Sequence, residues 1–122
     1  MAADLGLKTL TIDKEENPGG ACLYRGCIPS KALLHAAKVI NEAREASHIG
    51  ISFGQPQIDV NRLAEWKREV VGQLTGGLGQ LRKARDVQHI QGTARFVDNH
   101  TLEVEGHEGS IKFKHAILAT GS

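Results

Sequence analysis

The sequence is poor in cysteine and carries almost no net charge, and both shortages narrow the possible functions. Its 15 Lys and Arg nearly balance its 14 Asp and Glu, giving a formal net charge of +1 without a basic run, which argues against nucleic-acid binding. No apolar run is long enough to cross a membrane, and the N-terminus does not resemble a secretion signal. Two cysteines in 122 residues fit a reducing compartment, so the sequence predicts a cytoplasmic protein. The hydrophobic share of 40% argues against disorder, and the length of 122 residues suffices for one small domain.

Both cysteines lie in the glycine-flanked segment 19–31, which reads GGACLYRGCIPSK. A regular helix separates residues i and i+5 by about 7.5 Å of rise alone, whereas a disulfide needs Cα atoms closer than roughly 7 Å. Cys22 and Cys27 can therefore pair only across a distorted turn, for which Gly26 supplies the backbone freedom. Pro29 and the helix formers after it predict a helix that begins at or just after the pair.

This placement favours a redox-active pair. The positive end of a helix dipole and the cations Arg25 and Lys31 would both stabilise a thiolate, and a small disulfide loop beside a thiolate is reducible. Two other interpretations stay open from the spacing: a buried free cysteine with a chance neighbour, and a zinc site. Structural zinc normally takes four ligands. The six histidines are scattered without ligand spacing: His35, His48, His89, His100, His107 and His115.

The whole segment resembles the active-site motif of the flavin-dependent disulfide oxidoreductases, G-G-T-C-x-x-x-G-C-[IV]-P-[ST]-K. Within that family the chain is most similar to the members that oxidise dihydrolipoamide, and the similarity covers nearly its whole length. The other matching stretches are 3–9, the cysteine block through 38, 73–78, 101–106 and 117–122. The sequence departs from the motif at Ala21, where Thr is common, and at Tyr24 and Arg25, where Asn and Val are common.

The resemblance implies a role for each residue of the motif. Cys22 resembles the interchange thiol that meets dihydrolipoamide, and Cys27 resembles the charge-transfer thiol that faces the flavin. Lys31 resembles the lysine near the reactive flavin nitrogen, whose charge would stabilise the reduced, anionic flavin. These three residues are the expected catalytic set, and no metal is expected. The expected cofactor contacts are the same three residues with Asp13, Gly20, Gly92, Thr93, Ala94, Thr120 and Gly121.

The start of the chain predicts part of a dinucleotide-binding fold. Residues 1–6 are typical of a helix end that stops at Gly6, and 8–12 alternate as a strand does, with Asp13 at the end. In such folds an acid there bonds the ribose hydroxyls, and the glycine-rich phosphate loop lies about 20 residues upstream. We therefore expect 1–122 to be a partial FAD-binding domain, without the first strand, the GxGxxG loop, the NAD domain and the dimerisation domain. A solvated turn acid is the alternative for Asp13.

The expected fold class is α/β: a partial Rossmann-like FAD-binding domain with two long helices and a small antiparallel β-meander. Apolar periodicity predicts helices over 29–47 and 59–85, the second capped by Asp59, with a loop at 49–57 between them. Glycines in the second helix cost about 1 kcal/mol each, which indicates close packing on a neighbour; they are Gly72, Gly76, Gly77 and Gly79. Strands are predicted at 87–91, 93–97, 101–104, 111–114 and 115–119.

These observations predict a piece of an enzyme that passes electrons from dihydrolipoamide, through the two cysteines and FAD, to NAD⁺. By resemblance, the NAD would be bound by a domain absent here, and the intact parent would be a homodimer. Its substrate would be carried on a lipoyl domain of a 2-oxo-acid dehydrogenase complex. Two alternatives stay open. One is a sister enzyme that reduces glutathione or mercuric ion, although Ser30 and 75–78 favour dihydrolipoamide. The other is an inert isolated chain that does not retain FAD.

Overall fold

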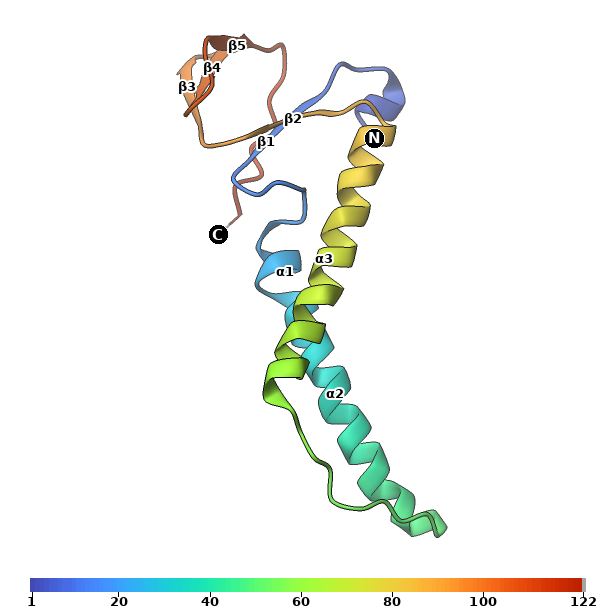
Figure 1. Ribbon diagram of the computed structural model, residues 1–122. Helices are drawn as coiled ribbons and strands as arrows, with labels where there is room; N and C mark the ends of the chain where they lie inside the picture. Colours follow the sequence, from blue (N-terminus) through green and yellow to red (C-terminus); the bar gives the residue numbers. More distant parts are fainter. Residues whose placement is uncertain (122) are drawn as a thin grey trace. The chain divides into compact units, whose positions relative to one another are not determined.

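The computed structural model describes residues 1–121, so Ser122, the last residue of the stretch 117–122, lies outside the described part. The chain divides into two compact units (Figure 1). The helical unit is Ala21–Thr75, and the sheet unit combines Met1–Gly20 with the chain from Gly76 onward. Each predicted site residue therefore belongs to one unit or the other, and each unit is described by itself.

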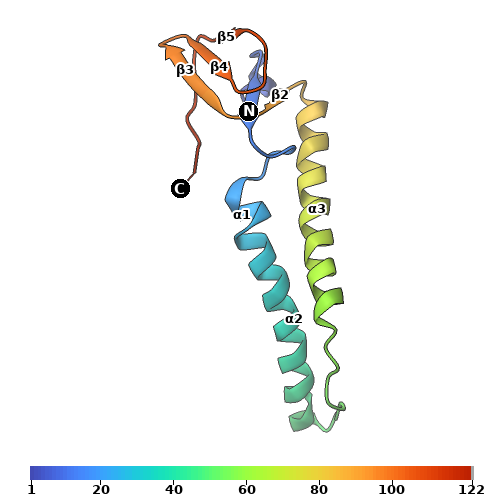
Figure 2. The same cartoon turned by 60° about the vertical axis from the view of Figure 1, so that its left-hand side comes forward.

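The helical unit consists of two long helices connected by an extended loop. Helix α2 (Cys27–Glu45) follows the short α1 (Gly20–Tyr24), and the 3-10 turn η2 (Ala46–Ile49) ends at Gly50 in the left-handed conformation. Within this unit, α2 runs beside the first part of α3 (Val60–Ala84) in the opposite direction (Figures 1 and 2). Both long helices confirm the prediction, but α2 begins two residues early, at Cys27 itself.

Two side-chain contacts explain how these helices are held. The Asp59 Oδ1 atom accepts a hydrogen bond from the Arg62 N–H at 3.0 Å, which confirms the predicted cap of α3. The rings of His35 on α2 and Trp66 on α3 lie with centroids 6.2 Å apart. Trp66 is half-buried, so it packs between the helices.

Close packing explains only one of the four glycines in α3. A Cβ added at Gly79 would collide with the side chain of Asn17. At Gly72, Gly76 and Gly77 it would meet nothing within 4 Å, so the predicted explanation is wrong for these three.

The sheet unit contains a parallel pair and an antiparallel meander. The pair is β1 (Leu10–Asp13) with β2 (Gln88–Gln91), and the meander is β3 (Ala94–Asp98), β4 (Thr101–Val104) and β5 (Ser110–Lys112) in that order. At the N-terminus, η1 (Ala3–Leu5) ends at Gly6 with φ 79°, as predicted. The fold class, including the small antiparallel meander, is confirmed.

The predicted strand at 115–119 is wrong. These residues belong to no regular element, and Ile117 is 90% exposed. Their apolar pattern is that of a strand, but no described strand pairs with their backbone, and a strand needs such a partner.

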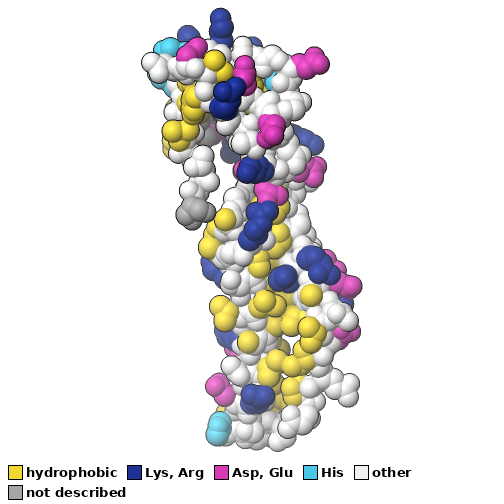
Figure 3. All heavy atoms as spheres, turned by 90° about the vertical axis from the view of Figure 1, so that its left-hand side faces the viewer, with side chains coloured by type: hydrophobic (Ala, Val, Ile, Leu, Met, Phe, Trp, Pro, Cys, Tyr) yellow, Lys and Arg dark blue, Asp and Glu magenta, His cyan; other side chains and the backbone are white. Residues whose placement is uncertain are grey.

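Few side chains of the described chain are buried. The buried apolar residues are Leu23 and Ala32 in the helical unit and Leu102 and Val104 in the sheet unit. Large apolar side chains such as Leu34, Phe53 and Leu118 stay exposed, and Figure 3 shows such side chains gathered over the helical unit. None of the helices in the described part is long and apolar enough to cross a membrane.

Candidate functional site

The two cysteines form a disulfide at the break between α1 and α2. Cys22 lies in α1 and Cys27 is the first residue of α2, with their Cα atoms 4.8 Å apart. Both residues are exposed. The predicted pairing across a distorted turn is confirmed, and neither the zinc site nor the free cysteine fits a bonded pair.

Gly26 makes this ring possible because the chain there passes close to its own backbone. A Cβ added at Gly26 would lie 3.2 Å from the Ala21 carbonyl oxygen and 3.3 Å from the Cys22 Cα. The Arg25 N–H donates to the Ala21 carbonyl at 2.8 Å, which closes α1. Ser30 opens α2 by donating its N–H and its hydroxyl to the Gly26 carbonyl, at 3.1 and 2.7 Å.

The start of α2 gives Cys27 a positive environment. As the first residue of the helix, it lies where the unpaired N–H groups and the dipole favour negative charge. Lys31 follows four residues later, so the two residues share one face of α2. Lys31 is exposed, and no ion pair among the described residues engages it. Once the disulfide opens, these two features favour a thiolate at Cys27.

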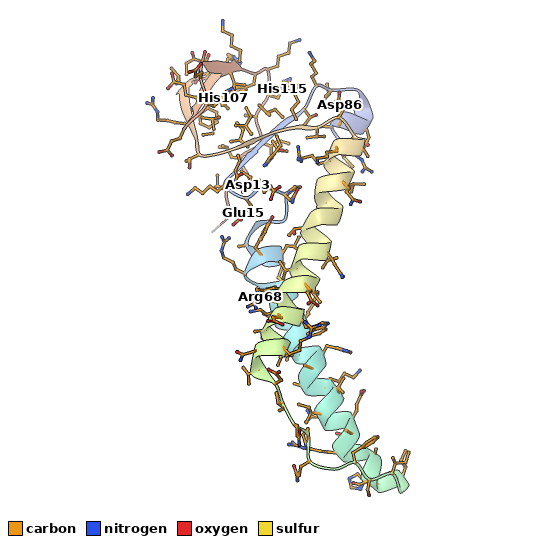
Figure 4. The ribbon with its side chains drawn as sticks, viewed as in Figure 1. Asp13, Glu15, Arg68, Asp86, His107 and His115 are labelled. Atoms are coloured by element: carbon orange, nitrogen blue, oxygen red, sulfur yellow. A yellow bond between two sulfur atoms is a disulfide. The ribbon has the colours of Figure 1, made fainter. Side chains whose placement is uncertain are left out.

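In the sheet unit, two of the predicted cofactor contacts, Asp13 and Gly92, meet at the carboxyl end of the parallel pair. Asp13 is opposite Gln91 in the register, and the Gly92 N–H donates to the Asp13 carbonyl at 2.8 Å. Asp13 is half-buried, and its Oδ1 atom accepts the Glu15 N–H at 3.0 Å, so the acid shapes the turn after β1. Figure 4 shows Asp13 and Glu15 at this end of β1.

His89 fixes the same turn, although the sequence predicted no role for it at this site. Its Nε2 atom lies 3.0 Å from the Glu15 carbonyl oxygen, and its Nδ1 atom lies 3.0 Å from the Thr11 hydroxyl. Because a carbonyl oxygen can only accept, the Nε2 atom donates in the contact with Glu15. Gln91 adds a hydrogen bond from Nε2 to the Lys14 carbonyl at 2.8 Å. The only signal in the sequence was a polar pattern on a short strand.

Comparison with known proteins shows which family the chain belongs to. The family model described as "Pyridine nucleotide-disulphide oxidoreductase" matches residues 1–122. The chain belongs to this family. Three curated relatives, each named "Dihydrolipoyl dehydrogenase", are 48% identical in Vibrio cholerae, 48% in Haemophilus influenzae and 47% in Vibrio parahaemolyticus. Each match covers 98% of this chain and 26% of the relative, so the chain spans about a quarter of their length.

Membership of the pyridine nucleotide-disulphide oxidoreductase family fits the disulfide between Cys22 and Cys27. The helical unit holds Cys22, Cys27 and Lys31, and the sheet unit holds the other predicted contacts. Ala94 begins β3, directly after Gly92 and Thr93, and Gly20 begins α1. Thr120 and Gly121 are exposed and lie outside regular structure. Among the described residues, no group of three or more His, Cys, Asp or Glu could hold a metal ion.

Proposed function

We propose that this chain is the dithiol-bearing part of a dihydrolipoyl dehydrogenase, which oxidises dihydrolipoamide and reduces NAD⁺. The observation that best supports this proposal is the exposed disulfide. Its second cysteine is the first residue of a long helix, and Lys31 lies one turn further on. The names of the relatives that match nearly all of the chain support the same substrate over glutathione or mercuric ion.

The first half-reaction needs only the two cysteines and the substrate. A thiolate of dihydrolipoamide attacks the Cys22 sulfur, the disulfide bond breaks, and Cys27 leaves as a thiolate held by the helix end and Lys31. The second substrate thiolate then attacks the mixed disulfide, which releases oxidised lipoamide and leaves Cys22 reduced. Two electrons have passed to the pair, and the two thiol protons go to solvent or to a neighbouring base.

The residues of the sheet unit are suitable for holding the adenosine part of FAD. Asp13 ends a strand of a parallel pair, where dinucleotide folds place the acid that bonds ribose hydroxyls. Its Oδ2 atom has no hydrogen-bond partner within the described chain, so it can accept a hydroxyl. Gly20, Thr93, Ala94, Thr120 and Gly121 stay predicted contacts, as does Gly92. Bound FAD would supply the route for two electrons from the dithiol to NAD⁺.

Three finer statements belong to the same proposal. The parent enzyme would be a homodimer, would meet its substrate on a lipoyl domain of a 2-oxo-acid dehydrogenase complex, and would work in the cytoplasm. Their support is the resemblance of the motif and the sparse cysteine content.

An inert isolated chain is the second candidate, and the small core favours it for these 122 residues taken alone. The described part has only four buried apolar residues, and large apolar side chains remain exposed on both units. Such a chain would keep the disulfide but would hold FAD weakly.

The test combines thiol counting with flavin binding. The oxidised chain is mixed with dihydrolipoamide, and its new thiols are counted by alkylation and mass; we expect two thiols per chain. FAD is then titrated while its fluorescence is followed, and saturable quenching that weakens in Asp13→Asn would support the adenosine site. Reduction without quenching would favour the inert chain, and no reduction would refute the proposed activity.

A further inference from the structure

Two side chains of β2 hold the turn that follows β1 in the sheet unit. The Gln91 Nε2 atom donates to the Lys14 carbonyl at 2.8 Å, and the His89 Nε2 atom donates to the Glu15 carbonyl at 3.0 Å. Both carbonyls belong to residues that directly follow Asp13, which Figure 4 shows at the end of β1. The path of the chain after this acid therefore depends on two side chains of the neighbouring strand.

The half-buried His89 ring is held at both of its nitrogens. Its Nδ1 atom lies 3.0 Å from the hydroxyl of Thr11, which is the residue directly opposite His89 in the parallel register. That hydroxyl also lies 3.2 Å from the Gln88 carbonyl oxygen. Contacts at both nitrogens fix the direction of the ring, so its Nε2 atom is aimed at the turn.

The other end of the turn packs against α3. A Cβ added at Gly79 would collide with the side chain of Asn17, so the two residues are already in close contact. A turn held by β2 on one side and by α3 on the other has little freedom to move. A polar group on such a turn is preorganised, which lowers the cost of ordering it when a ligand binds.

The same turn fixes the carboxylate of Asp13. Its Oδ1 atom accepts the Glu15 N–H at 3.0 Å, and this N–H belongs to the peptide group whose carbonyl accepts from Gln91. His89 holds the next carbonyl along the chain. Because a carboxylate is rigid and planar, holding Oδ1 also restricts the position of Oδ2.

We propose that His89 and Gln91 are positioning residues for the cofactor: by holding this turn, they aim the Asp13 Oδ2 atom at the ribose hydroxyls of the adenosine part of FAD. The inference rests on the proposed function, which assigns the ribose contact to Asp13. It adds two residues that act through Asp13, and it makes recognition of the ribose hydroxyls depend on the side chains of β2.

The experiment compares the binding of adenosine diphosphate (ADP) with that of 2′,3′-dideoxy-ADP, which lacks the hydroxyls that Asp13 would bind. Each nucleotide is titrated into the 122-residue chain at one fixed pH, and the amide NMR signals of the chain report the dissociation constant. We expect ADP to bind about tenfold more tightly, because hydrogen bonds to a charged group contribute about that factor. Asp13→Asn should lose most of this preference.

Matched variants test the two positioning residues. Gln91→Met and His89→Phe keep the approximate size of each side chain but remove its donor. Each should lower the ratio of the two dissociation constants by about twofold or more, and the double variant should bring the ratio close to one. The affinity for dideoxy-ADP should stay unchanged, because Asp13 has no hydroxyl to bind in that nucleotide.

A rescue and a control complete the set. His89→Gln keeps an N–H donor at about the reach of Nε2 and should retain most of the preference. Gln88→Ala changes the neighbouring position of β2, where no hydrogen bond of the described chain involves the side chain, and it should leave the ratio unchanged.

The outcomes separate this inference from the proposed function. An unchanged ratio in both single variants, or equal weakening of the two nucleotides, would overturn the positioning role; equal weakening would leave His89 and Gln91 with a purely structural role. A wild-type ratio near one, or no binding of ADP, would overturn the ribose contact of Asp13 and the positioning role with it. The reduction of the disulfide by dihydrolipoamide is counted without any nucleotide, so its failure would refute the proposed function separately.

Discussion

Replacing Gly26 by alanine should make the disulfide easier to reduce. The new Cβ would lie 3.2 Å from the Ala21 carbonyl oxygen and 3.3 Å from the Cys22 Cα, and both of these atoms are backbone. Neither can swing aside as the end of a side chain can, so the ring must open slightly. The disulfide holds the ring closed, whereas the reduced chain is free to relax. The substitution therefore destabilises the oxidised form more than the reduced form.

The size of the effect follows from the crowding. Inserting a methyl group into a closely packed position costs about 1–3 kcal/mol. Since about 1.4 kcal/mol corresponds to about 30 mV for a two-electron couple, the reduction potential should rise by about 20–65 mV if all of the strain is in the oxidised ring. A more positive potential means a stronger oxidant, so the variant should be reduced at a lower concentration of dithiol.

The potential is measured by equilibrating the chain in redox buffers of known ratio and counting thiols by alkylation. Gly77→Ala is the control, because it is the same substitution at a position where a Cβ meets nothing within 4 Å. The control should leave the potential unchanged and should stabilise α3 by up to about 1 kcal/mol. An unchanged potential in Gly26→Ala would refute the argument that the closed ring requires a residue without a side chain.

Three further predictions concern the cap of α3, the turn between β3 and β4, and the redox pair. Asp59→Ala should lower the unfolding free energy by about 1 kcal/mol, measured by urea titration with circular dichroism, whereas Asp59→Asn should retain most of it. The hydrogen bond donated by the His100 N–H lowers the pKa of Asp98. The turn between β3 and β4 should therefore be most stable at pH values above the ordinary aspartate pKa. It should lose stability as the pH falls through the lowered pKa of Asp98. An NMR titration that gave Asp98 its ordinary pKa would contradict this prediction. If the proposed function holds, Cys27→Ser in a full-length dihydrolipoyl dehydrogenase that contains this sequence should abolish the thiolate–flavin charge-transfer absorbance, whereas a surviving band would contradict the proposed roles of Cys22 and Cys27.

The local chemistry of the dithiol could be predicted because it depends on residues that are adjacent in sequence. The spacing of five between Cys22 and Cys27 already excluded a regular helix, and Gly26 was the one residue in between that allows a sharp turn. The cap at Asp59 was predictable for the same reason, since the cap and the N–H that it accepts are three residues apart. The exact start of α2 was not, because Pro29 is tolerated anywhere in the first turn.

Features that depend on distant residues could not be predicted. A hollow of about 330 Å³ in the helical unit brings together Arg25 and Arg68, which are 43 positions apart, and nothing in either local segment indicates the other. The apolar run 115–119 has the pattern of a strand, but a strand forms only where a partner accepts its hydrogen bonds, and the described chain provides none. Likewise a glycine inside a helix suggests a close neighbour, which Gly79 has and Gly72 lacks.

Gly72 is the residue at which these two kinds of information combine. A glycine in a helix interior costs stability, and close packing does not explain this one, because a Cβ there would enter open space. It lines the hollow, one turn of α3 after Arg68. Packing within the fold therefore gives no reason for a glycine at this position.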